Sequence, residues 1–225
     1  CSFLSGSPLR RYMHDASDGP PAVNPALCAG VALFNEGYHL AAHEPWEAAW
    51  LPLETGDDER LLHGLIAATA ATHHATDRNW SGAAGCAANA VDYLTAVPPG
   101  HRDVSLEPVV EWCRRLRVDP ETIERVGPPR IRVDEAATGF TDLDVHAALL
   151  AAPGLASTVD AGDAATLETA ATLAIEERGT GRTQVIDLVF SYLTHPERRP
   201  QIAARIDDHV GRANRKRRDV DGLFE

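Results

Sequence analysis

The sequence predicts an all-α protein. Apolar residues recur at spacings of three and four in one segment after another, which is the period of an amphipathic helix. Alternating apolar and polar runs, which form half-buried strands, are almost absent. Proline, glycine and Asn/Asp clusters separate the periodic segments. We expect about five helices in an N-terminal bundle or superhelix built from helical hairpins, followed by a further helical region.

Five helices are predicted before residue 133. Residues that cap or turn the backbone set their limits: Asn24-Pro25 starts the first, Gly37 separates it from the second, and Ser81 caps the fourth. Pro45 lies inside the second helix, where it frees the Ala41 carbonyl from its backbone hydrogen bond. The expected helices span about 25–35, 38–51, 59–76, 82–97 and 106–116, with a short helix at 119–125 and an extended segment at 127–133.

Composition divides the chain into three predicted parts. Residues 1–23 are rich in Gly, Pro, Ser and Asp and are expected to form a flexible arm. Residues 24–133 form a helical domain. In residues 134–225 Ala, Thr and Asp predominate and aromatic residues are scarce, which indicates a C-terminal helical extension. Its helices are expected near 143–151, 164–177, 183–193 and 197–217.

The net negative charge of the chain limits the classes of binding partner that we expect. The formal net charge is -12, and Lys216 is the single lysine among 21 basic residues. A surplus of surface carboxylates is typical of proteins that work in concentrated salt, so we expect a halophilic source, with a generic acidic protein from a GC-rich genome as the alternative. Nucleic acid and anionic membranes are poor partners for such a surface. The basic cluster at 212–218 is a candidate contact for nucleic acid, but the preferred interpretation is favourable charge at a helix end, paired with acidic groups.

The sequence shows no membrane span. Even the apolar run 61–72 is interrupted by His63 and Gly64. The N-terminal residues have a short apolar start followed by arginines, the reverse of a secretory signal peptide, so a cytoplasmic location is the default expectation. The four cysteines stand far apart without a Cys-x-x-Cys pair, which argues against a zinc ribbon or a dithiol redox motif.

The second predicted helix carries the candidate site. His43, Glu47 and Trp50 occupy positions i, i+4 and i+7 and therefore share one helical face. A neutral imidazole and an ionised carboxylate one turn apart can both ligate a metal ion. His73 on the third helix is expected to face the core and to supply a third ligand, with His74 as its alternative. Zinc, manganese or iron would suit this mixed set of nitrogen and oxygen ligands.

Neighbouring residues complete the hypothesis. Glu44 is the candidate catalytic base and a candidate fourth ligand. His63 and His74 are separated by a rise of about 16 Å along one helix, so at most one of them can join the site. The remaining candidates, for a further ligand or for the wall of the site, are His39, His63, Trp46 and Trp50.

Several stretches together carry a family resemblance. They are GVALFNEGYHLAAHEPWEAAW, LLHGLIAATAATHH, the Asn79-x-x-Gly82-Ala83 turn and PPRIRV. These stretches resemble the domain-of-unknown-function family 309, a helical family of bacteria and archaea, over about residues 27–133. Its signature His-x-x-x-Glu-x-x-Trp/Tyr matches His43, Glu47 and Trp50. The resemblance implies a metal bound at this motif and adds no particular reaction.

The chain departs from the family pattern in its third helix. Relatives tend to have Leu-Gln-Gly-Leu-Ile-Gln where this chain has Leu-His63-Gly-Leu-Ile-Ala67, so two side-chain amides are missing. His63 is the candidate replacement as ligand or donor, whereas Ala67 would leave a gap.

Two functions from different classes follow. The first is a metal-dependent hydrolase, in which an ion held by His43, Glu47 and His73 lowers the pKa of a bound water and Glu44 takes its proton. The second is a helical protein–protein interaction or scaffold protein, in which a buried His-Glu-Trp cluster locks helices together. The sequence identifies neither a small-molecule nor a protein partner, and it leaves a homo-oligomer open.

Overall fold

The all-α prediction is confirmed by a computed structural model that describes residues 23–177 and 184–221. The α-helices of this part are α2 (Val23–Asn35), α3 (His39–Trp50), α4 (Asp57–Thr76), α5 (Trp80–Thr95), α6 (Glu107–Val118), α7 (Val145–Ala156), α8 (Ala164–Glu177), α9 (Gln184–Thr194) and α10 (Arg199–Asp221). Short 3₁₀ helices are η1 (His101–Asp103), η2 (Pro120–Glu124), η3 (Phe140–Asp142) and η5 (Pro196–Arg198). The predicted N-terminal arm, apart from Val23, lies outside the described residues.

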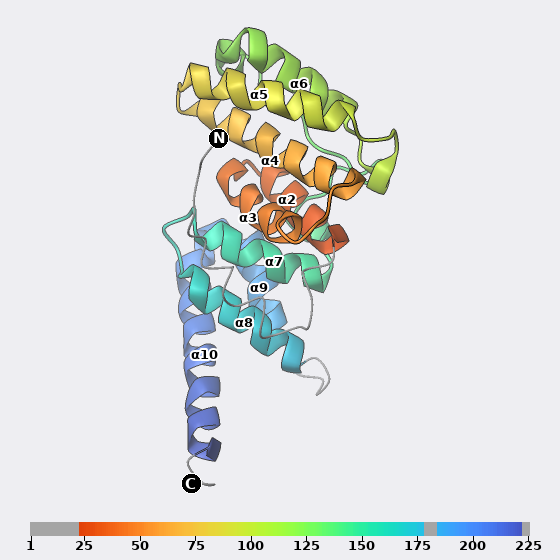
Figure 1. The fold of residues 1–225 in the computed structure, drawn as a ribbon. Coiled ribbons are helices and arrows are strands. Elements are labelled where there is room, and N and C mark those ends of the chain that lie inside the picture. Colours follow the sequence, from red (N-terminus) through yellow and green to blue (C-terminus); the bar gives the residue numbers. More distant parts are fainter. Residues whose placement is uncertain (1–22, 178–183, 222–225) are drawn as a thin grey trace.

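Consecutive helices pack as hairpins in a stack (Figure 1). In the first half α2 packs on α3, α3 on α4, α4 on α5 and α5 on α6, which agrees with the five helices expected there. α7 then covers α2 and α3, while α8, α9 and α10 pack beyond it. Buried apolar side chains from all these helices form one continuous cluster. The boundary between residues 133 and 134 stays a prediction.

α2 and α3 meet where a glycine faces a tryptophan. Trp46 is completely buried, and its indole Nε1 donates to the Leu27 carbonyl at 3.2 Å. A Cβ atom at Gly30 would lie 2.2 Å from Cε2 and from Nε1 of this ring. Since atoms cannot approach so closely, the indole can lie flat on α2 only if residue 30 has no side chain.

Pro45 shapes the contact between α3 and α7. It cannot donate to the carbonyl of Ala41, one turn before it. That carbonyl lies beside Gly154 of α7, where a Cβ atom would be 3.0 Å from the Ala41 oxygen and 3.6 Å from the Pro45 ring. The freed carbonyl therefore lies at a close contact between α3 and α7, where residue 154 has no side chain.

Arg199, at the start of α10, connects the C-terminal helices to the turn between α2 and α3. The side chain is buried, and its Nε and Nη2 atoms donate to the carbonyls of Tyr192 and Leu193 at 3.1 and 3.2 Å. Nη1 donates to the Tyr38 hydroxyl at 2.6 Å, and the guanidinium lies 5.1 Å from the centroid of that ring. Arg199 thus satisfies carbonyls that α9 leaves unpaired at its end and ties them to Tyr38.

One predicted helix cap is wrong. α5 begins at Trp80, and Asn79, not Ser81, caps it by accepting the Gly82 N–H at 3.1 Å. Asn is as good a cap as Ser, so position in the turn decided between them. Among the residues described, none of the helices combines the length and the apolarity that a bilayer-spanning segment requires.

Candidate functional site

The His43 and Glu47 side chains face each other on α3. His43 Nδ1 lies 3.7 Å from Glu47 Oε2, beyond hydrogen-bond distance, and the two side chains are 24% and 21% exposed. Burial lowers the pKa of His43, although the charge of Glu44 opposes that shift. The predicted pair is therefore close together and partly open to solvent, and burial favours the neutral form of the His43 imidazole.

Trp50 belongs to a different cluster, which joins α3, α4 and α5. Its indole Nε1 donates to Glu59 Oε1 at 3.0 Å, and His63 Nδ1 lies 3.3 Å from the same oxygen. The His63 ring stacks on Tyr93 with centroids 3.9 Å apart and lies 4.6 Å from the Trp50 ring. His63 is therefore held between two aromatic rings and a carboxylate. The other candidate wall residue, Trp46, lies in the core.

His73 was expected to face the core, and this prediction is wrong. Its side chain is 35% exposed, and its Nε2 lies 3.3 Å from the carboxylate of Asp77 on the same helix. His74 is its neighbour at 6.2 Å between ring centroids and contacts Asn79. A small rotation of α4 about its axis is enough to move His73 from the core to this partly exposed position. The spacing of apolar residues does not determine the rotation of the helix that closely.

His39 lies near the same end of the helix pair. Its ring meets Phe34 edge to face at 4.9 Å. Burial, and then the charge of His73, lower the pKa of His39, so His39 and His73 are electrostatic neighbours across α3 and α4. The lowered pKa of His39 disfavours protonation of its imidazole.

The candidate ligands do not form a set of three. Within residues 23–177 and 184–221, no three side chains of His, Cys, Asp or Glu are placed to hold one metal ion. A catalytic zinc site requires three protein ligands and a structural one four. The residues present therefore do not fit the metal site that the resemblance implies, since only the His43–Glu47 pair is assembled and His73 is turned to Asp77.

Glu44, the candidate base, lies beside the C-terminal helices. Its Cβ would be 3.5 Å from a Cβ at Gly154 of α7, and its charge acts on Glu168 of α8. Glu168 is only 8% exposed. Burial, and then the charges of Glu44 and Asp163, raise the pKa of Glu168. The catalytic role of Glu44 stays a prediction.

The raised pKa of Glu168 makes stability depend on pH. A carboxyl group whose pKa is higher in the folded state contributes stability below its ordinary pKa of 4.5, and this contribution is lost as pH rises through the raised value. We expect Glu168→Gln to raise the unfolding free energy by about 1 kcal/mol near pH 7, because the buried charge is removed. The gain should vanish towards pH ~4 in urea titrations. The exposed Glu111→Gln should show no such trend, and a Glu168→Gln variant less stable than the parent near neutral pH would contradict the argument.

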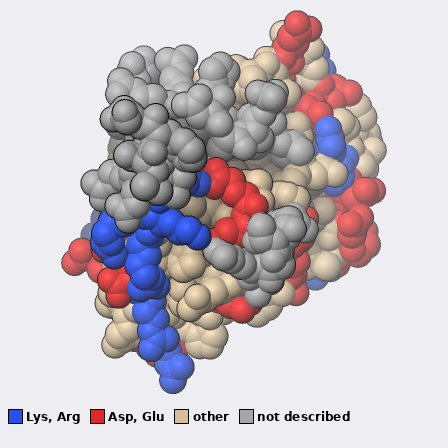
Figure 2. All heavy atoms as spheres, turned by 90° about the horizontal axis from the view of Figure 1, so that it is seen from below, with Lys and Arg blue, Asp and Glu red and all other residues tan. Residues whose placement is uncertain are grey.

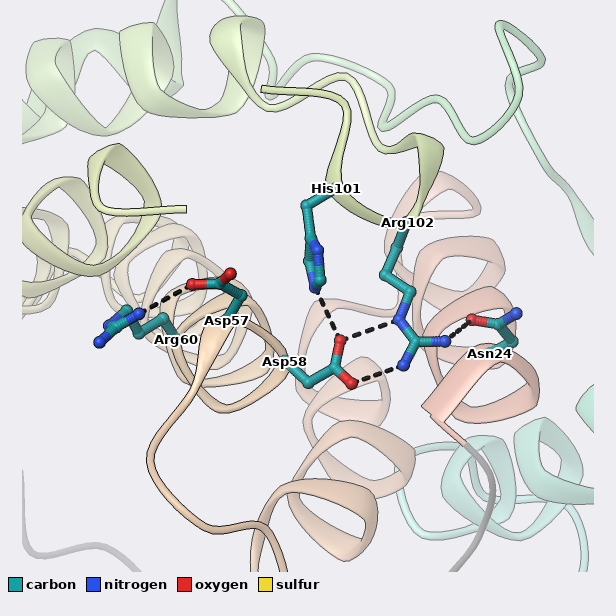
Figure 3. Close-up of polar contacts among 6 residues, drawn as sticks. All are labelled: Asn24, Asp57, Asp58, Arg60, His101 and Arg102. Atoms are coloured by element: carbon teal, nitrogen blue, oxygen red, sulfur yellow. Dashed lines mark hydrogen bonds and ion pairs between the residues drawn. The ribbon is translucent and has the colours of Figure 1, made fainter. Parts of the chain in front are cut away.

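A second polar cluster was missed by the sequence analysis. Figure 3 shows Asp58, near the start of α4, held by Arg102 and His101 of η1. Arg102 donates to both carboxylate oxygens of Asp58 at 2.8 and 2.5 Å and to Asn24 Oδ1 at 2.7 Å, and His101 Nε2 lies 2.7 Å from Asp58 Oδ1. Hydrogen bonds from Arg102, above all, hold the pKa of Asp58 below its ordinary value.

Strained backbone surrounds this cluster. Positive φ angles occur at four non-glycine residues of two adjoining loops, and Asp134 N–H donates to the Asp103 carbonyl at 3.0 Å between them. Each such residue costs on the order of 1 kcal/mol or more, so the ion pairs at Asp58 help to offset this strain. The residues with positive φ are Arg102 (55°), Asp103 (55°), Asp134 (50°) and Glu135 (62°).

Comparison with known proteins concerns the stretch of chain that contains the His-x-x-x-Glu-x-x-Trp motif. A search of curated proteins gave no match. The family described as "Domain of unknown function (DUF309)" matches residues 27–86, which run from α2 into α5. This range is shorter than the 27–133 suggested by the sequence motifs, and it includes every candidate site residue named above from His39 to His74. The resemblance to the DUF309 family is therefore confirmed for residues 27–86, the part that contains the His-x-x-x-Glu-x-x-Trp motif.

Proposed function

We propose that this chain is a helical interaction protein in which the His-x-x-x-Glu-x-x-Trp stretch holds α3 against α4. The proposal rests on the cluster of Trp50, Glu59, His63 and Tyr93. Glu59 Oε1 of α4 accepts a hydrogen bond from the Trp50 indole of α3 and contacts His63. The His63 ring in turn stacks on Tyr93 of α5, so the cluster joins three helices. Stacked helical hairpins of this kind present extended surfaces suited to binding other molecules.

The arrangement of the ligands supports this proposal over the metal-dependent hydrolase. His63 contacts Glu59 one turn before it in α4, and His73 contacts Asp77, the C-cap residue of the same helix. A metal at His43 and Glu47 would have two protein ligands and would depend on water or a bound partner for the rest, which gives weak binding. Two side chains that are about one quarter exposed and 3.7 Å apart serve equally as a polar contact at the edge of the helix pair.

A substitution at the shared acceptor tests the structural role. Glu59→Leu leaves the Trp50 N–H and the His63 ring without their acceptor, so we expect a loss of about 2 kcal/mol of unfolding free energy. Glu111→Leu is the matched control, because Glu111 makes an ion pair with Arg115 on the surface of α6 and is half exposed. The control should change stability by no more than about 0.5 kcal/mol in urea unfolding. Equal stability of the two variants would contradict the proposed role of Glu59.

Metal analysis separates the two functions directly. Elemental analysis of freshly purified protein without an affinity tag should find well under one metal per chain. Added zinc or manganese should shift the melting temperature of the parent and of His43→Ala by the same small amount. A stoichiometric metal that is lost in His43→Ala would overturn the proposal and favour the hydrolase.

A further inference from the structure

The end of α10 projects from the bundle. α10 has 23 residues, and Figure 1 shows its C-terminal turns extending past α8 and α9. Apolar side chains anchor its first part against the core; Val210 is the last buried one, and Ala213 still packs against the core while partly exposed. After Val210, Arg212 and the consecutive residues 214–217 are exposed. The last turns of α10 are therefore open to a partner on several sides.

Basic side chains follow one face of this helix. Arg205, Arg212, Arg215 and Lys216 are spaced at i, i+7, i+10 and i+11, which places them within one stripe. We call these four residues the α10 stripe. Figure 2 shows Lys and Arg side chains in a continuous band on this side of the molecule. Asp207 and Asp208 are exposed next to Arg205, whereas the segment 209–218 contains five basic and no acidic residues, in a chain whose net charge is -12.

Ion pairs within the described part of the chain leave most of this charge uncompensated. Arg217 pairs with Glu176 of α8, but no ion pair reaches Arg212, Arg215 or Lys216 from the described part of the chain. Stabilisation by the helix dipole is confined to the last turn, and α10 continues to Asp221. Like charges at i+3 and i+4 repel each other along a helix. Among the side chains of this cluster that the structure describes, the sequence-based interpretation of pairing with acidic groups therefore accounts for Arg217.

We propose that the α10 stripe binds the phosphodiester backbone of nucleic acid without reading its sequence. The stripe is about 16 Å long at 1.5 Å per residue, and duplex DNA carries one negative charge per ~1.7 Å of its axis, so several phosphates lie within its reach. Three of the four residues are arginines, whose planar guanidinium groups bind phosphate oxygens in pairs.

The chemistry of the stripe favours this partner over a protein or a membrane. Protein interfaces are anchored by aromatic and aliphatic side chains, and a helix that lies on a membrane needs an apolar face. The exposed positions of α10 from Ala204 to Arg217 include no large apolar side chain. Binding through charge alone, driven by release of counterions, suits a phosphate backbone. This inference is independent of the proposed role of α3 and α4.

Two triple variants with equal charge change test the proposal. Arg212, Arg215 and Lys216 are replaced by Gln in one, and the exposed Arg114, Arg117 and Arg132 are replaced by Gln in the other. Fluorescence anisotropy with labelled duplexes of about 20 base pairs and two unrelated sequences is measured at salt concentrations from ~25 to ~200 mM. We expect the parent and the control variant to bind both duplexes with equal affinity. A plot of log affinity against log salt concentration should have a slope of about -3. The stripe variant should bind at least about tenfold more weakly, with a shallower salt dependence.

Several results would overturn the inference. They are no binding by the parent at the lowest salt, equal weakening in both variants, or a clear preference for one of the two duplexes. Binding to phosphatidylserine vesicles or to a polyglutamate peptide, but not to DNA, would identify a different anionic partner and reject nucleic acid. Circular dichroism of each variant shows whether α10 is intact, so that a folding defect is not read as a loss of binding.

Discussion

Replacing Gly30 by alanine is expected to destabilise the protein by about 3 kcal/mol or more, although alanine favours helix formation by up to ~1 kcal/mol over glycine. The new methyl group would occupy the position of the Trp46 ring, 2.2 Å from two of its atoms. Trp46 is fully buried and cannot turn away without leaving its hydrogen bond to the Leu27 carbonyl. The expected result is therefore a separation of α2 and α3, or a repacked Trp46, at a cost well above the helix propensity gained.

Gly85→Ala provides the matched control. Gly85 lies in α5, is exposed, and a Cβ atom there would have nothing within 4 Å. This change should raise the unfolding free energy by up to about 1 kcal/mol through helix propensity alone. Urea unfolding followed by tryptophan fluorescence compares the two variants. If Gly30→Ala proved as stable as Gly85→Ala, the glycine-on-tryptophan contact could not be present as described.

Arg199→Met is expected to have the second large effect, a loss of about 2–4 kcal/mol. Methionine keeps much of the apolar volume but donates no hydrogen bond, so the carbonyls of Tyr192 and Leu193 and the hydroxyl of Tyr38 lose their donor. Buried acceptors without a partner pay their full desolvation cost. The loss should loosen the contact between the C-terminal helices and the α2–α3 turn.

The adjacent Arg198→Met is the control for this experiment. The Arg198 side chain is 72% exposed, and its guanidinium lies 3.8 Å from the carboxylate of the adjacent Glu197. Thermal unfolding should show a change of at most about 0.5 kcal/mol for this variant. Hydrogen exchange at the end of α9 should speed up in Arg199→Met and stay unchanged in Arg198→Met. Equal behaviour of the two variants would mean that the buried guanidinium contributes no net stability.

The fold could be predicted because its signals are local. Apolar periodicity and helix-ending residues placed the first helices within about two residues of their observed limits. The largest error was at α7, expected to end near residue 151, because the helix continues through Pro153 to Ala156. A proline inside a helix is a strong sequence signal against it, but burial of α7 against its neighbours outweighed that penalty.

The site could be predicted only within single helices. The i, i+4 spacing correctly placed His43 opposite Glu47. Whether His73 joins them depends on the rotation of α4, and its partner proved to be Asp77. The Asp58 cluster and the Arg199–Tyr38 contact join residues far apart in sequence, from different helices and loops. A single sequence contains no pattern that predicts such pairs.

The position of the Ala41 carbonyl beside Gly154 has a consequence for substitutions at positions 45 and 154. Without a proline at position 45, the Ala41 carbonyl could return to the hydrogen bonding of its own helix, and a side chain at position 154 would meet less crowding. With the proline kept, any larger residue at 154 would push α7 outward. Homologues of this chain are therefore expected to change these two positions together, and paired substitutions there would trace how the α7 region became attached to the α2–α3 hairpin.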